Sequence, residues 1–125
     1  MLDPVKNFAI VQLSAGYAAG VTEVVLLGGH GAKLPISTAE GQFNLVWYNS
    51  TDYPNPADDP SVEIVRCTAR TDDTLTIIRA QEGTSDVNHN TGGKTYKMIL
   101  SVTKKTIDDL NTFIANSILN TQIFS

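Results

Sequence analysis

The sequence has few cysteines and few basic residues, and both shortages exclude classes of function. Cys67 is the single cysteine among 125 residues, so neither an internal disulfide nor a cysteine-based zinc site is possible. We interpret Cys67 as a small core residue, because free cysteine is among the most buried residue types. Lysine and arginine total nine against thirteen acidic residues, which gives a net charge of −4. Because phosphate backbones are bound by clustered basic side chains, we expect no nucleic-acid partner.

Long apolar runs and a signal peptide are also missing. No apolar run approaches the ~20 residues of a membrane-spanning helix, so we expect no membrane span. The small residues Ala18, Ala19 and Gly20 look like a cleavage site, but Asp3 precedes the first lysine and polar residues interrupt the apolar stretch before them. A secretory signal has a basic start and an unbroken apolar segment, so we do not expect one here.

No motif with a catalytic mechanism is present. The sequence lacks GxSxG, the signature of a serine nucleophile on a strand-to-helix turn. Two acidic pairs, Asp58-Asp59 and Asp72-Asp73, lie in turn-rich segments, where aspartate bonds to nearby backbone N–H groups. Adjacent residues of a turn point in different directions, whereas catalytic carboxylates face each other across a cleft. We therefore expect no enzymatic activity and no cofactor; the alternative is a hydrolase that depends on one of these acidic pairs.

The segment Gly28–Gly31 looks most like a ligand-binding loop, but its details do not fit one. A phosphate-binding loop has glycine directly before its lysine, whereas Ala32 precedes Lys33 here and leucine follows. We predict a wide surface turn with His30 exposed in it. His30 and His89 show no ligand spacing with a nearby acid, so no metal site is expected.

The strongest structural signal is the stretch from Ser61 to Thr84, which predicts a β-hairpin. Two runs rich in β-branched residues flank the turn around Asp72 and Asp73. Strands of this length joined by a short polar loop typically pair as a hairpin. The short aspartate side chains tolerate unusual φ in the turn, and Gly83 allows the chain to leave the sheet at positive φ.

A charged pair lies within this apolar hairpin. With the turn centred near Asp72, Arg79 lies diagonal to Glu63 across the two strands, a distance that a long side chain spans. We predict an ion pair between Glu63 and Arg79 that fixes the strand register. The alternative is that the same residues, with Glu82, form a salt bridge at an interface.

Further strands are expected on both sides of the hairpin. Phe43 to Asn49 alternates with Phe43, Leu45 and Trp47 on one side, and Trp47 is the best candidate for a core anchor. Val21 to Leu27 is nearly all apolar at its end, so we predict a central strand. Tyr96 to Val102 is the last strand. We predict a mainly β fold, a compact antiparallel β-sandwich or barrel-like domain of five or six strands with one C-terminal helix.

Three regions are expected in the chain: an N-terminal arm at residues 1–20 with a short strand at Phe8 to Leu13, a β domain at 21–103, and a helix at 104–125. Thr103 or Thr106 is suited to cap the helix. One face of this helix carries a stripe of apolar side chains, which we expect to pack either on the protein's own sheet or on other copies of the protein. The residues of this candidate oligomer interface are Ile107, Leu110, Phe113, Ile114 and Ile118. The apolar end at Ile123 and Phe124 favours packing on copies.

The run EIVRCTARTDDTLTIIRAQEGT, followed by a histidine and by a last strand that leads into a helix, resembles small β modules of tailed-bacteriophage virion proteins. The resemblance covers roughly residues 21–111. The matching residues in and after the hairpin are Glu63, Val65, Arg66, Thr68, Leu75, Arg79, Gln81, Glu82, Gly83, Thr84 and His89.

This resemblance implies a non-enzymatic structural protein of a tailed-phage virion, assembled in the cytoplasm of the bacterial host. Such modules occur in tail-fibre, baseplate and capsid-surface proteins, so an appendage, an adaptor, a fibre base or a capsid decoration protein all fit. We expect a homotrimer that also contacts other virion proteins. The alternative is a module of the tail or baseplate that binds a host receptor or surface glycan through Trp47, Tyr48 and Tyr53.

Overall fold

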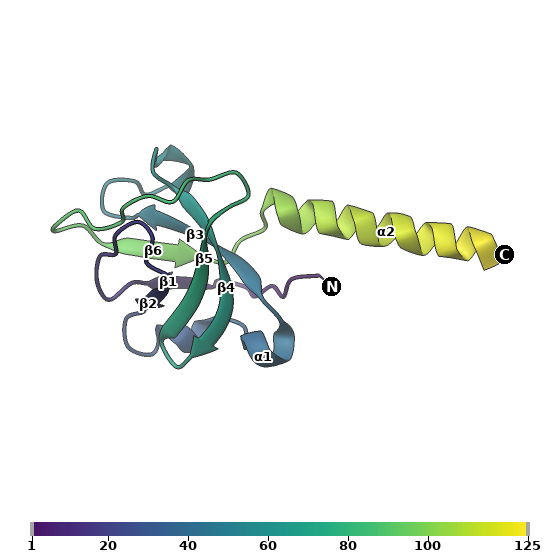
Figure 1. Ribbon diagram of the computed structural model, residues 1–125, viewed down its shortest axis with the longest axis horizontal. Coiled ribbons are helices and arrows are strands. Elements are labelled where there is room, and N and C mark those ends of the chain that lie inside the picture. Colours follow the sequence, from purple (N-terminus) through teal and green to yellow (C-terminus); the bar gives the residue numbers. More distant parts are fainter. Residues whose placement is uncertain (1, 125) are drawn as a thin grey trace.

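The structure is a computed structural model that describes the backbone of residues 2–124 and the side chains of residues 2–119. Six strands form one antiparallel sheet in the order β1-β6-β3-β4-β5-β2, and the sheet curls into a half-barrel (Figure 1). The strands are β1 (Ile10–Gln12), β2 (Glu23–Val25), β3 (Phe43–Asn49), β4 (Glu63–Thr71), β5 (Thr74–Gln81) and β6 (Tyr96–Ile99). The predicted mainly β, barrel-like fold with a C-terminal helix is confirmed.

Within residues 2–124, helices are few and only one is long. Two single-turn 3-10 segments, η1 (His30–Lys33) and η2 (Pro56–Asp58), and the one-turn α1 (Ser37–Glu40) lie in the connections between strands. The long helix α2 (Lys104–Phe124) follows β6 and projects away from the sheet (Figure 1). With a rise of about 1.5 Å per residue, its 21 residues extend about 30 Å. The apolar residues Ile123 and Phe124 lie outside the described side chains.

The predicted hairpin is present as β4 and β5. Asp72 in its turn has φ +52°, and Gly83, where the chain leaves the sheet, has φ +81°. The ladder is not regular, because Ile64 pairs with Gln81 while Arg66 pairs with Ile78. The extra residue on β5 makes a β-bulge. Nothing in the alternation of the sequence marks this bulge.

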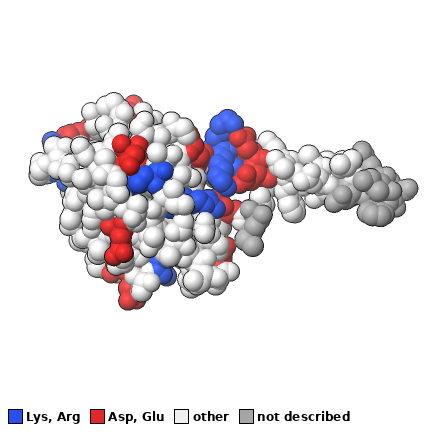
Figure 2. All heavy atoms as spheres, in the orientation of Figure 1, with Lys and Arg blue, Asp and Glu red and all other residues white. Residues whose placement is uncertain are grey.

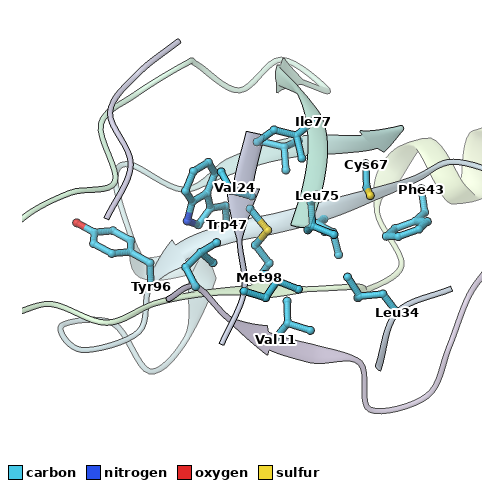
Figure 3. Close-up of a cluster of buried hydrophobic side chains, with 14 of the residues drawn as sticks. Val11, Val24, Leu34, Phe43, Trp47, Cys67, Leu75, Ile77, Tyr96 and Met98 are labelled. Atoms are coloured by element: carbon cyan, nitrogen blue, oxygen red, sulfur yellow. The ribbon is translucent and has the colours of Figure 1, made fainter. Parts of the chain in front are cut away.

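The core lies inside the curl of the sheet, and it is built from the alternating residues of each strand. Phe43, Leu45 and Trp47 of β3 are all fully buried, as the alternation predicted, and the buried Cys67 lies near Phe43 (Figure 3). The cluster draws on every strand, and its other members include Val11, Val24, Leu34, Leu75, Ile77, Tyr96 and Met98. No described side chain of α2 belongs to this cluster. The helix is therefore an addition to a complete β core.

Two predictions about the first part of the chain need correction or refinement. The expected central strand at Val21 to Leu27 is only three residues long, Glu23–Val25, and stands last in the strand order. It was expected to be central because its end is nearly all apolar. Val24 and Leu26 are indeed buried, but the curl of the sheet, which brings β2 back toward β1, provides this burial. A bridge between Leu13 and Leu26 joins the two edges. The short strand expected near Phe8 to Leu13 is present as β1, so part of the N-terminal segment is built into the sheet.

The antiparallel ladders give the half-barrel two distinct ends. Asn49 pairs with Tyr96 at one end, where the loop of residues 50–62 begins after β3 and the loop of residues 82–95 finishes before β6. At the other end β6 finishes at Ile99, which pairs with Ile10 at the start of β1. We call this second end the helix end, because α2 begins there after four linking residues, 100–103.

Candidate functional site

The base of α2 is fixed to the β domain by a polar network. Glu82, just after β5, accepts a hydrogen bond from the backbone N–H of Lys105 (2.9 Å), so its carboxylate caps the first turn of the helix. Asn44 of β3 donates to the other Glu82 oxygen (2.9 Å) and accepts from Arg66 Nη1 (2.9 Å). Arg66 in turn holds Asp3 through two hydrogen bonds of 2.9 and 3.0 Å. Sheet, N-terminal segment and helix therefore meet in one chain of contacts.

The charges of this network favour its ionised form. Burial alone would raise the pKa of Glu82, but hydrogen bonds from Asn44, the Lys105 N–H and Thr103 outweigh it, and the pKa lies below its ordinary value. Burial would also raise the pKa of Asp3, yet its contacts with Arg66 and Lys105 leave the pKa lowered. The network is thus an ionic clamp at neutral pH.

Beyond this clamp, α2 leaves an apolar stripe uncovered. The predicted interface residues are 39% to 58% exposed, and the β domain does not cover them. They are Ile107, Leu110, Phe113, Ile114 and Ile118. Spacings of three and four residues put Ile107, Leu110, Ile114 and Ile118 on one helical face. Within a single chain the stripe does not pack on its own sheet, which was one of the two expected arrangements.

The helix also lacks charge over most of its length. Lys104 and Lys105 pair with Asp108 and Asp109 in the first turns, and no charged residue follows Asp109 up to the end of the sequence. In the view of Figure 2, acidic and basic residues gather where α2 leaves the β domain, and the described part of the helix beyond them carries none. A helix exposed on all sides to water typically carries a charged face, so this composition is typical of a helix with partners.

The N-terminal segment lies along a different side of the helix. A shallow groove there is lined by Leu2 and by Asp109, Thr112, Phe113 and Asn116 of α2. Thr112 and Asn116 are two residues from Ile114 in either direction and so lie away from the stripe. The N-terminal segment therefore does not cover the face that carries Ile107, Leu110, Ile114 and Ile118.

A second polar cluster lies inside the β domain, around Glu63. The predicted ion pair is present: Arg79 Nε and Nη2 donate to the two oxygens of Glu63 at 2.9 Å each. Glu63 is fully buried and also faces His89 Nε2 (2.9 Å) and the backbone N–H of Ala80 (2.9 Å). Trp47 stacks on His89, and the Arg79 guanidinium lies 4.8 Å from the centre of the Trp47 ring.

Arg79 does more than fix strand register, because it also binds two connections to the sheet. Its Nη1 donates to the carbonyls of Ala18 and Val21 at 3.0 Å, and its Nη2 donates to Val87 O (2.6 Å). Asp86 adds an ion pair at 3.0 Å. The guanidinium therefore joins the segment before β2 and the loop before β6 to the hairpin. These contacts support the intradomain interpretation of the ion pair over the interfacial one.

Burial and hydrogen bonding set the charge states in this cluster. Desolvation alone would raise the pKa of Glu63, but hydrogen bonds from Arg79, Ala80 and His89 keep it below its ordinary value. Burial lowers the pKa of His89 below its ordinary value, and the nearby Glu63 carboxylate offsets this only in part. The imidazole is therefore neutral near pH 7, with its proton on Nε2, which faces a carboxylate.

The aromatic residues of the glycan hypothesis are not arranged as a binding surface. Trp47 is fully buried in the core and Tyr48 is also buried, so neither ring is open to stack on a sugar. Tyr53 is half-buried and lines a polar hollow with Asp52, Asp59 and other residues of the loop end. The geometry thus does not support sugar recognition by Trp47 and Tyr48.

One member of each acidic pair accepts hydrogen bonds from backbone N–H groups. Asp59 accepts from the N–H groups of Asn49 and Ser61 at 2.8 Å each. Asp73 accepts from Gly29 N (3.0 Å) and Gly31 N (2.8 Å). The backbone N–H groups of the glycine-rich loop thus bind a carboxylate of the same chain.

The prediction of an exposed His30 is wrong. Its side chain is half-buried, and its Nδ1 accepts a hydrogen bond from the backbone N–H of Gln12 (2.9 Å), which connects the loop to β1. Among the residues that the structure describes, no group of three histidine, cysteine or acidic side chains is placed to hold a metal ion. Within the same part of the chain, no helix combines the length and the apolarity that crossing a bilayer needs.

No protein-family model matches the chain, and no curated protein matches it either.

Sequence reasoning missed two residues of the helix base. Glu82 was considered with the Glu63 pair and as a residue of the resemblance, and Asp3 only in the argument against a signal peptide. Glu82 is 23 positions from Lys105 and Asp3 is 102 positions from it, so no helix-capping pattern signals either contact. A polar residue that follows a β-hairpin directly was the one available signal for Glu82.

Proposed function

We propose that this protein is a small, non-enzymatic structural component of a tailed-phage virion that assembles with itself through α2. The observation that carries the proposal is the projecting helix, with an exposed apolar stripe and no charge after Asp109. Burying such a stripe is favourable by roughly 25 cal/mol per Å² of apolar surface removed from water. Copies of the same helix offer the complementary surface, as in parallel bundles.

The polar cluster around Glu63 and the polar network at the base of α2 both support a structural role. Residues that carry the resemblance to virion modules occupy them: Glu63, Arg79 and His89 hold the loops to the sheet, and Arg66 and Glu82 hold the helix base. Contacts of this kind keep a helix at a fixed angle to its domain. Three copies around one axis would form a threefold appendage, adaptor or capsid-surface protein, whose remaining surfaces dock on other virion proteins.

The oligomer is tested by solution mass. Light scattering or sedimentation should give a trimer for the full chain and a monomer for a chain that ends at Thr103. The shortened chain keeps every residue of the core cluster, so it is expected to fold. Ile114→Lys in the full chain should also give a monomer, because the charge falls in the stripe. Asn116→Lys, on another side of the same helix, is the matched control and should leave the trimer intact.

The virion role needs a separate measurement. An antiserum raised against the purified chain should label phage particles from the producing bacterium in electron micrographs, at one defined position. Purified particles that contain no trace of the chain by mass spectrometry would contradict the proposed location. A full-length chain that stays monomeric at all accessible concentrations would contradict the proposed assembly through α2.

A further inference from the structure

Exposed apolar side chains are concentrated at one end of the molecule. Among the described residues, fifteen large hydrophobic side chains are exposed; four lie between Leu2 and Ile10 and seven between Val102 and Leu119. Both segments belong to the helix end, where α2 and the N-terminal segment leave the sheet (Figure 1). Single exposed apolar residues are normal on a protein surface, but a concentration at one end indicates an interaction surface.

Phe8 is the most exposed residue of this set, at 98% exposure. It directly precedes Ala9, which is buried and whose carbonyl accepts the Leu100 N–H (2.9 Å). Ile10, two residues further on, pairs with Ile99 at the end of β6. Phe8 therefore lies at the helix end, next to the start of the segment that links β6 to α2.

The backbone at Phe8 is strained as well. Its φ is +58°, in the left-handed region that glycine adopts readily and that is a true outlier for a bulky residue. The Ile10 N–H donates to the Phe8 carbonyl (3.1 Å), which closes a tight turn just before β1. Within one chain the aromatic ring thus gains almost no contact, and its side chain disfavours the backbone that the turn requires. Strain of this kind is retained where another interaction compensates it.

We propose that Phe8 is an anchor of the interface between copies of this chain, where its ring is buried against the helix end of a neighbouring copy. This inference rests on the proposed assembly through α2. Helices in a bundle lie about 8–10 Å apart, so their bases are brought close together. The linker of residues 100–103 is short, and Glu82 and Asp3 clamp the helix base to the sheet. The helix ends of adjacent β domains then lie side by side around the base of the bundle.

A neighbouring copy is the occupant that these constraints select. When the helix bases of two copies are in contact, Phe8 at the helix end of one copy comes within reach of the β domain of the next. Aromatic side chains, phenylalanine included, are enriched at protein interfaces, and one buried ring removes a large apolar area from water. Phe8 would thus determine how tightly the copies bind once the helices have aligned them.

The variant Phe8→Gly separates the two effects of this residue. Glycine relaxes the backbone of the turn, so a chain that ends at Thr103 and carries this change should melt no lower than its parent. In the full chain, the same change removes the anchor and should weaken association at least tenfold, measured by sedimentation over a dilution series. Leu27→Ala, which truncates an exposed apolar side chain in the connection between β2 and η1, is the control and should leave association unchanged.

A second measurement does not depend on a substitution. Hydroxyl-radical labelling followed by mass spectrometry should find Phe8 protected in the full chain and fully reactive in the chain that ends at Thr103. A full chain that assembles through α2, yet is unaffected by Phe8→Gly and equally labelled at Phe8, would overturn this inference and leave the proposed function intact. A full chain that remains monomeric would overturn both.

Discussion

Replacing Arg79 by methionine is the most informative change in the β domain. Methionine keeps the apolar part of the side chain but removes the guanidinium, and with it two hydrogen bonds to Glu63. Glu63 then stays fully buried with only the N–H groups of Ala80 and Val87 and the imidazole of His89 as partners. An ionised carboxylate without its counter-charge is costly in such a site.

The size of the effect follows from this burial. Removing one partner of a buried ion pair costs about 3–5 kcal/mol of unfolding free energy. Three backbone carbonyls also lose the donor that joins two connections to the hairpin. Because domains are stable by only about 5–15 kcal/mol, Arg79→Met should remove a large share of the total. The melting temperature of a chain of this size should fall by roughly 10–20 °C.

The assay is urea unfolding and thermal melting at pH 7 and fixed protein concentration, followed by circular dichroism and by the fluorescence of Trp47, which touches this cluster. Lys94→Met is the matched control, since it breaks an exposed pair with Asp52 (2.8 Å) and should leave the midpoint almost unchanged. The double variant Glu63→Gln, Arg79→Met should lose less stability than the two single variants together. A loss below about 1 kcal/mol for Arg79→Met would refute the reasoning, because a guanidinium that is exchangeable for a thioether cannot be holding these segments.

Three further predictions concern His89, the glycine-rich loop and Cys67. The pKa of His89 is lowered in the folded protein, so the stability that neutral His89 contributes is complete above the unfolded pKa of about 6.5. This stability is lost as the pH falls below that value, with a slope of up to ~1.4 kcal/mol per pH unit. Unfolding free energies measured at pH 7.5, 6.5 and 5.5 should show this slope, and His89→Phe should flatten it. A Cβ on Gly31 would lie 1.9 Å from Asp72 O, so Gly31→Ala should lower the unfolding free energy by about 1–3 kcal/mol, whereas Gly28→Ala, with open space around it, should be tolerated; equal melts for the two would contradict the close packing. Burial raises the pKa of the Cys67 thiol to about 11, so it should react with a thiol reagent only after unfolding, and rapid labelling of the native protein would show that the site is open.

Much of the sheet was predictable because its signals are local. Phe43 to Asn49 alternates with period two, and β3 has these bounds and buries Phe43 and Trp47. The hairpin followed from two β-rich runs around an aspartate turn, and the Glu63–Arg79 pair followed from placing the turn. Such sequence patterns agree with the folded structure because they depend on backbone geometry over only a few residues.

What failed were inferences about position in the sheet and about side chains in loops. Val21 to Leu27 was expected in the centre, because an apolar run indicates burial without saying whether a neighbouring strand or the curl of the sheet provides it. His30 was expected to be exposed, yet it binds β1. His89 was considered only as a metal-ligand candidate and as a residue of the resemblance, yet it is fully buried beside Glu63. Each of these depends on contacts between segments far apart in the sequence.

The sequence by itself determined that the protein has a β domain with a core around Trp47, a charged pair in its hairpin and a C-terminal helix with one apolar stripe. Propensity, alternation and helical period set these features within short segments. Only the tertiary structure decided that the stripe stays uncovered by its own sheet. That outcome depends on Glu82 and Asp3, which meet the first turn of α2 across 23 and 102 positions of sequence and hold the helix away from the sheet. A local pattern contains no information about contacts over such distances.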